Sequence, residues 1–224
     1  MLTDLLKKYQ PFQPVVLHDP AEKLLRMDFT AANTDLTTTI LDDITLFSEY
    51  VTTTLQQHQC RLGIGGYGEH RTIYARSSHF DTEGEPRRLH LGIDIWGPAG
   101  TPVYAPLDGE VHSFRFNDVQ GDYGATIILR HQLEGHIFHT LYGHLSLADL
   151  EGLYDNKKIA AGQIIAHFGN IKENGQWPPH LHFQVIEDME GYIGDYPGVC
   201  RYSEKARFLA NCPDPDLILQ MIIQ

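Results

Sequence analysis

From Arg61 onward the chain consists of short runs that alternate apolar and polar residues, with turn signals about every ten residues. Side chains alternate between the two faces of a strand, so such runs predict strands, and closely spaced turns connect antiparallel neighbours. The expected strands lie within 100–111 (with a turn at 107–109), 124–131, 136–142, 159–168 and 180–186, and a hairpin is expected at 132–135. The pattern therefore predicts a mainly β protein with a compact antiparallel β-sheet.

Residues 1–60 have a mixed, partly helical character that differs from the rest of the chain. Between residues 38 and 55 apolar residues recur near a 3.6-residue period, which predicts an amphipathic helix that packs one face on its neighbour. These apolar residues are Ile40, Leu41, Ile44, Phe47, Val51 and Leu55. We expect a partly helical N-terminal region at 1–60 and a β domain at 61–224, with one short terminal helix within 213–224.

The chain carries 17 Lys and Arg residues against 29 Asp and Glu residues, a formal net charge of -12. Such a charge repels phosphate backbones and anionic lipid, so nucleic acid is not an expected partner. No apolar run approaches the roughly 20 residues that span a bilayer. Asp4, Lys7 and Lys8 interrupt the one apolar candidate for a secretory signal. The sequence predicts a cytoplasmic protein without a membrane partner and leaves the oligomeric state open.

The three cysteines, Cys60, Cys200 and Cys212, are odd in number and include no C-x-x-C pair. They predict reduced thiols rather than a disulfide framework or a cysteine-built zinc site. A single bridge between Cys200 and Cys212 remains the alternative.

Histidine and aspartate side chains occur at spacings that suit a metal site. His90 and Asp94 are four residues apart, which in a straight strand is about 13 Å, so both can bind one ion only if the chain bends between them. Gly92 lies where that bend is easiest. His180 and His182 would share one face of a strand about 6.6 Å apart, so one can bind a metal while the other faces a substrate.

Two histidines and one carboxylate give zinc three protein ligands and leave a fourth position for water, which is the arrangement of a catalytic site. The bound water is acidified to a nucleophile, and a general base or oxyanion partner is expected beside the ion. His180 is one candidate for that partner, and His144 is the second.

The chain carries His-x-x-x-Asp at 90–94, a glycine- and proline-rich strand pair at 97–111, Tyr-x-His-Leu at 142–145 and His-Leu-His-Phe at 180–183. In this order the motifs resemble the lysostaphin/LytM family of zinc peptidases, which cut peptidoglycan cross-links, over residues 87–187. The resemblance implies zinc ligands at His90, Asp94 and His182 and catalytic roles for His144 and His180. It also implies an antiparallel β domain with a narrow groove over the metal.

Two segments depart from the pattern of this family. A longer stretch at 169–179, which carries Trp177, replaces a short Gly-x-Ser/Thr-Gly segment, and Gln184 stands where many relatives have an acidic residue. Both are expected to border the groove and to affect the choice of substrate more than the zinc chemistry. Trp177 is either an exposed substrate platform or part of the core.

The block Gly-Gly-Tyr-Gly-Glu-His-Arg at 65–71, typical of an unusual subgroup of this family, lacks the spacings of phosphate-binding loops. The simplest interpretation is a tight turn packed away from the metal. The alternative is a substrate or regulatory contact over the groove, made by Tyr67, Glu69, His70 or Arg71. Under that alternative His70 is slightly preferred, as a fourth ligand that excludes water.

These observations predict a zinc metalloendopeptidase that hydrolyses an amide bond in peptidoglycan or a cell-wall-derived peptide by metal-activated water. One alternative is an intracellular zinc amidase that acts on a small substrate unrelated to the wall. A second alternative is a non-catalytic binding or regulatory module. The presence of all five metal and catalytic positions disfavours this second alternative.

Overall fold

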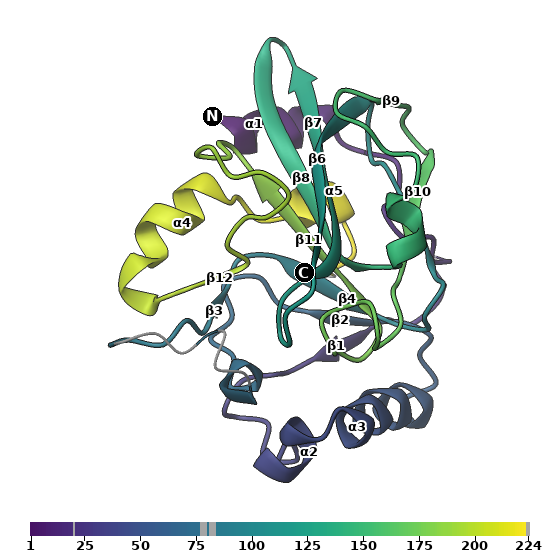
Figure 1. Cartoon of the computed structure of the whole chain (residues 1–224), viewed down its shortest axis with the longest axis vertical. Coiled ribbons are helices and arrows are strands. Elements are labelled where there is room, and N and C mark those ends of the chain that lie inside the picture. The colour runs from purple at the N-terminus through teal and green to yellow at the C-terminus, as the bar shows by residue number, and fades with distance from the viewer. Residues whose placement is uncertain (20, 77–79, 81–83, 223–224) are drawn as a thin grey trace.

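The computed structural model describes residues 1–19, 21–76, 80 and 84–222, and its centre is an eight-stranded sheet (Figure 1). The strand order is β1-β2-β4-β11-β8-β7-β6-β9. The β1–β2 pair is parallel, and the other neighbours in this sheet are antiparallel, so the predicted mainly β class is confirmed. The strands are β1 (Leu25–Met27), β2 (Gly63–Gly65), β4 (Ile93–Trp96), β6 (Gly109–Asn117), β7 (Gly124–Leu133), β8 (His136–Leu145), β9 (Lys158–Ile159) and β11 (His180–Ile186).

Two smaller sheets accompany the large one. In the first, β5 (Pro102–Tyr104) pairs with β10 (Ile164–His167), and in the second, β3 (Leu89–His90) pairs with β12 (Val199–Cys200). The two strands expected within 100–111 therefore exist but pair with other strands, and the candidate at 159–168 divides into β9 and β10. The predicted hairpin joins β7 to β8 through Glu134 and Gly135, whose φ angles of 50° and 85° suit a two-residue turn.

The helices are α1 (Leu2–Tyr9), α2 (Thr38–Asp42), α3 (Ile44–Gln57), α4 (Lys205–Asn211) and α5 (Asp216–Leu219). The single helix predicted at 38–55 is two helices, because the Asp43 carboxylate caps α3 by accepting hydrogen bonds from the backbone N–H groups of Thr45 and Leu46. α5 lies within the predicted 213–224, of which 223–224 fall outside the described residues. α4 was not predicted.

The N-terminal region is built into the same sheet. β1 lies beside β2, and Figure 1 shows α2 and α3 beyond β1, at that edge of the sheet. The division of the chain at residue 60 stays a prediction.

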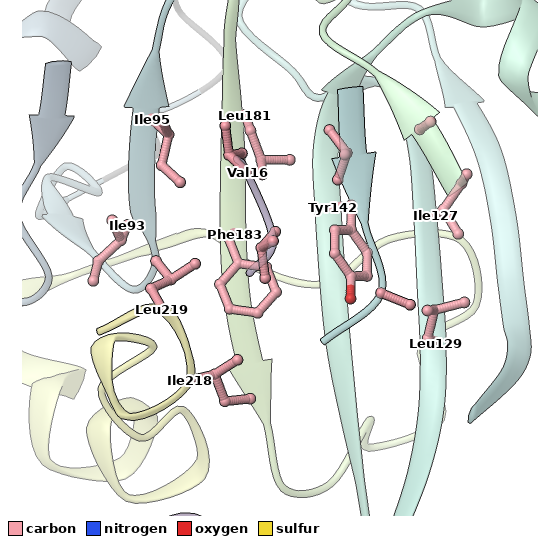
Figure 2. Close-up of a cluster of buried hydrophobic side chains, with 14 of the residues drawn as sticks. Val16, Ile93, Ile95, Ile127, Leu129, Tyr142, Leu181, Phe183, Ile218 and Leu219 are labelled. Atoms are coloured by element: carbon pink, nitrogen blue, oxygen red, sulfur yellow. The ribbon is translucent and has the colours of Figure 1, made fainter. Parts of the chain in front are cut away.

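The largest apolar cluster lies on one face of the central sheet, beneath α5 (Figure 2). Ile93 and Ile95 of β4 and Leu181 and Phe183 of β11 belong to this cluster and are fully buried. Because side chains alternate along each strand, the residues between them point to the opposite face. Polar residues of β4 and β11 are therefore brought together on that face.

A second cluster packs α3 against the opposite face. Phe47 of α3 is fully buried, and its ring lies 6.2 Å from the rings of Phe29 and Trp96 and 6.3 Å from that of Trp177. Trp177 is only 2% exposed, so it is part of the core rather than an exposed platform.

The three cysteines are buried free thiols, so the alternative bridge between Cys200 and Cys212 is absent. Within the described residues, no helix combines the length and apolar character needed to cross a membrane.

We predict that Phe47→Ala lowers the free energy of unfolding by about 3–5 kcal/mol, because it removes a fully buried ring shared by α3 and the sheet. Urea unfolding followed by circular dichroism measures the change. Leu46→Ala is the matched control, since Leu46 is the preceding residue in α3 and is 38% exposed. Equal effects of the two substitutions would contradict the packing of α3 on the sheet.

Candidate metal centre

Three buried side chains bring one ligand atom each to a common point. His90 Nε2 lies 3.0 Å from His182 Nδ1 and 3.2 Å from Asp94 Oδ1, and the last two atoms are 3.0 Å apart. A tetrahedral zinc ion with ligands about 2.0–2.1 Å away would separate them by roughly 3.3 Å. The three predicted metal residues thus meet at nearly the spacing of metal ligands, and the described residues contain no other such group.

The backbone produces this convergence by the bend predicted from the sequence. The chain turns at Gly92, between β3 and β4, so His90 pairs with Val199 whereas Asp94 lies directly opposite His182 on β11. A Cβ atom at position 92 would lie 2.5 Å from His182 Cε1. Glycine is therefore favoured here because it leaves room for the His182 imidazole.

Hydrogen bonds fix which ring nitrogen of each histidine carries the proton. His90 Nδ1 lies 3.0 Å from the Gly66 carbonyl oxygen, and His182 Nε2 lies 3.0 Å from Gln184 Oε1. The Gln184 amide nitrogen donates to the Pro197 carbonyl, so its oxygen is the atom that faces His182. Each imidazole therefore donates from its outer nitrogen and turns its other nitrogen toward the Asp94 carboxylate.

The protonation states of the site favour a cation. Burial, reinforced by the Arg71 guanidinium, lowers the pKa of His90 to about 4, so this imidazole is neutral near pH 7. Although burial opposes ionisation, the Arg71 guanidinium, which donates to Asp94 Oδ2, holds the pKa of Asp94 well below its ordinary value. The neutral His90 imidazole and the ionised Asp94 carboxylate meet the His182 imidazole at this point, and a bound divalent cation would satisfy all three groups.

The two candidate catalytic histidines line the same pocket of about 200 Å³ as Asp94 and His182. The ring centroids of His144 and His180 are 4.1 Å apart. His144 Nδ1 lies 2.8 Å from the Asn174 carbonyl oxygen, and His180 Nδ1 lies 2.7 Å from that of Pro178. Both rings therefore donate from Nδ1 to the backbone, which leaves Nε2 as an acceptor.

Burial keeps both rings neutral. It lowers the pKa of His180 to about 4, and together with the neighbouring His180 and His182 it holds the pKa of His144 well below its ordinary value. Neutral imidazoles with an unprotonated Nε2 are able to accept a proton.

The loop 169–179, expected to border the groove, is what orients both histidines. Its central residue, Asn174, is fully buried, and its side chain bonds both the N–H (3.1 Å) and the carbonyl (2.9 Å) of Trp177 and the carbonyl of Gly169. These bonds hold the loop so that its Asn174 and Pro178 carbonyl oxygens meet the two imidazoles.

A β-bulge aims His144. The β7–β8 register shifts between the Ala125–Leu145 and Ile127–Tyr142 pairs, so β8 carries one extra residue there. His144 adopts φ 63°, a left-handed conformation that residues other than glycine seldom take. Bulges redirect side chains beside functional sites, and such strain is concentrated at them.

The block 65–71 contacts the candidate metal centre, but not through His70, which was slightly preferred from the sequence as a fourth ligand. His70 is exposed, and its ring lies 6.2 Å from that of Tyr202, so it does not supply a fourth ligand. The simplest interpretation, a turn packed away from the metal, is also wrong, because Gly66 and Arg71 contact the candidate ligands His90 and Asp94. The hydroxyl of Tyr67 donates to the Cys212 carbonyl. Arg71 is instead the residue that reaches the centre, where its Nη1 donates to Asp94 Oδ2.

Two further residues act at the site in ways the sequence did not indicate. Gln184 orients His182 and does not border the groove. Tyr123 lines the pocket, donates to the Tyr196 carbonyl at 3.1 Å and lies 3.5 Å from His182 Nε2. The i, i+2 spacing of Gln184 and His182 on one strand was the available signal for the first; no motif marked Tyr123.

Parts of this chain are similar to known proteins. Residues 88–192 match the family model described as Peptidase family M23. DD-carboxypeptidase/endopeptidase Mpg of Neisseria meningitidis is 34% identical over 127 residues, which are 54% of this chain and 26% of the relative. Peptidoglycan DD-endopeptidase ShyA of Vibrio cholerae is 35% identical over 120 residues, 49% of this chain and 24% of the relative. The chain thus spans about a quarter of the length of the curated relatives it matches.

Among solved structures, the catalytic domain of the antimicrobial peptidase lysostaphin from Staphylococcus simulans is 25% identical and covers 55% of this chain and 81% of its own. The TM-score of this comparison is 0.37, so the similarity to the peptidase family rests on the sequence matches and not on this structural comparison.

We predict that the purified protein binds about one equivalent of a divalent transition metal and that Asp94→Ala abolishes most of this binding, because it removes one of three ligands. Elemental analysis of the purified protein measures its metal content, and titration calorimetry of the metal-stripped protein measures metal binding. Asp149→Ala is the matched control, since it removes a carboxylate that also contacts a histidine, His167. Full metal retention by Asp94→Ala would place the site elsewhere.

Proposed function

We propose that this chain, whose residues 88–192 match the model of peptidase family M23, is a zinc-dependent metallopeptidase that hydrolyses an amide bond in peptidoglycan or a peptide derived from it. One observation carries the proposal. One candidate ligand atom each of His90, Asp94 and His182 lies within 3.2 Å of the other two, beside a pocket that His144 and His180 line.

We assign His90 Nε2, Asp94 Oδ1 and His182 Nδ1 as the metal ligands. Two imidazoles and one carboxylate suit zinc, and a set of three leaves a position open for catalysis. When bound, zinc supplies Lewis acidity to a water molecule and to the carbonyl of the scissile amide. Gly66 and Gln184 hold the two imidazoles in the tautomers that direct their lone pairs inward.

His144 and His180 are the candidate proton carriers. Within the described residues the Nε2 of each has no hydrogen-bond partner, and each ring is held through Nδ1 by a backbone carbonyl. One of them accepts the proton of the attacking water at Nε2, and a proton is then delivered to the leaving amine. His180 is stacked on Trp96, with ring centroids 3.9 Å apart, which restricts its rotation.

The proposed substrate is inferred from the names of the relatives. The Neisseria protein is named a DD-carboxypeptidase/endopeptidase and the Vibrio protein a peptidoglycan DD-endopeptidase. Since the family match at 88–192 includes the residues of the proposed centre, peptidoglycan peptides are the substrates to test first. The earlier expectation of a cytoplasmic location stays a prediction.

Cleavage of defined cross-linked peptidoglycan fragments by the zinc-loaded protein, followed by mass spectrometry of the products, tests the proposal. New amine and carboxyl termini in the fragments support it. Cleavage of small amides alone would favour the intracellular amidase. A zinc-loaded protein that cleaves neither class would leave the non-catalytic module as the better interpretation.

We predict that His144→Ala and His180→Ala retain the metal but lower turnover by about 10²–10⁴-fold, the usual contribution of a general acid–base group. Metal content and initial rates are measured on the same preparations. His112→Ala is the control, since His112 is a partly buried strand histidine outside the described pocket lining. The division of roles fails if either variant loses zinc as completely as His182→Ala does.

We further predict that Asn174→Ala lowers turnover without lowering zinc content, because it releases the loop whose carbonyls orient both imidazoles. Asn170→Ala in the same loop is the control, since the Asn170 side chain bonds Glu173 and the Lys172 backbone at the surface. Equal rates for the two variants would contradict the role of the Asn174 side chain.

A further inference from the structure

Arg71 is a fully buried cation beside the candidate metal centre. Its Nη1 donates to Asp94 Oδ2 and lies 3.3 Å from the Tyr74 hydroxyl, and its Nε donates to Glu69 Oε2 at 2.8 Å. The guanidinium also lies over the Phe29 ring, 5.5 Å from its centroid. A buried charge is costly unless it is paired, and Arg71 is paired with two carboxylates.

The two oxygens of Asp94 have different partners. Oδ1 faces His90 Nε2 at 3.2 Å and His182 Nδ1 at 3.0 Å, whereas Oδ2 accepts the hydrogen bond from Arg71. The carboxylate is thus held in one rotation, with a single oxygen directed at the point where the imidazole lone pairs meet.

The sequence makes room for Arg71 at one position. Gly65 of β2 lies directly opposite Asp94 of β4 in the sheet, where a side chain would share the same face. A Cβ atom at position 65 would lie 2.5 Å from Arg71 Nη2 and 3.4 Å from Trp96 Nε1. The absence of a side chain opposite Asp94 is therefore what admits the guanidinium to the carboxylate.

We propose that Arg71 is a positioning residue for the metal centre: it occupies Asp94 Oδ2, so that Asp94 binds the metal through Oδ1 alone. Gly65 provides the space for this contact, and Glu69 holds the far side of the guanidinium. The inference rests on the metal site of the proposed function, but not on its substrate.

This arrangement has a consequence for the coordination number. A carboxylate with two unoccupied oxygens can bind one metal ion through both, and a second oxygen would take the position that catalysis needs open. With Oδ2 bonded to Arg71, the protein supplies three ligand atoms and leaves that position to water or substrate. Groups that support metal ligands in this way typically change metal affinity by about 10–100-fold.

The test compares metal binding by Arg71→Met, Arg71→Lys and Gly65→Ala with that of the unmodified chain. Zinc affinity is measured by competition with a chelator, and the geometry is read from the visible absorption spectrum of the cobalt(II)-loaded protein. We expect Arg71→Met to bind zinc about 10–100-fold more weakly. Its cobalt spectrum should lose the intensity of a four-coordinate site.

The two other variants keep the test decisive if Arg71→Met does not fold. Arg71→Lys retains the charge but cannot bond Asp94, Tyr74 and Glu69 together, so it should restore affinity only in part. Gly65→Ala retains the Arg71 residue but displaces its guanidinium, so it should change the cobalt spectrum in the same direction as Arg71→Met.

Arg130→Met is the matched control, because Arg130 pairs with Glu110 on β6 and β7, away from the centre. The inference is overturned if the folded Arg71 and Gly65 variants bind zinc with the affinity of the unmodified chain and give the same cobalt spectrum. This holds whatever the substitutions do to the stability of the protein. Neither zinc affinity nor the cobalt spectrum requires a substrate, so the test of Arg71 is separate from the test of peptidase activity. If the unmodified chain binds no metal, both fail; if it binds metal but cleaves no wall peptide, the role of Arg71 is still decided.

Discussion

The antiparallel pairing of β4 with β11 is the constraint on which the rest of the site depends. It places Asp94 directly opposite His182 and Trp96 opposite His180. The register is fixed by burial, since Ile93, Ile95, Leu181 and Phe183 fill the apolar cluster on the other face. A slip of one residue in either strand would move its polar side chains into that cluster and its apolar ones out of it. The fold therefore specifies the proposed metal centre through the same alternation that builds the core.

Around this pair, each polar group is oriented by another. Gly66 and Gln184 orient the imidazoles of His90 and His182, Arg71 holds Asp94, and loop 169–179 holds His144 and His180. Buried polar groups are stable only when paired, so each contact contributes to the fold and to the geometry together. The ligand lone pairs are the part of this network that a cation completes.

The sequence predicted the features that depend on local pattern. The strands followed from alternation, and the bend at Gly92 from the need to bring His90 and Asp94 to one ion. The two helices at 38–57 differ from the single prediction because the capping role of Asp43 was not recognised. His70 was slightly preferred, yet adjacent residues of an extended chain point to opposite sides. His70 forms a bridge with Leu89 and is exposed, whereas Arg71 is fully buried, and this choice depends on contacts that the local pattern does not show. The contacts of Gln184 and Tyr123 likewise depend on packing between segments distant in the sequence.

The most direct test of the account is a crystal structure of the zinc-loaded protein with anomalous diffraction measured on both sides of the zinc absorption edge. The account predicts one strong zinc peak about 2.0–2.2 Å from His90 Nε2, His182 Nδ1 and Asp94 Oδ1. It also predicts that Asp94 Oδ2 remains bonded to Arg71 and that the Nε2 atoms of His144 and His180 stay outside the coordination sphere. A zinc ion bound through His144 or His180, or a peak away from these three ligands, would contradict the account.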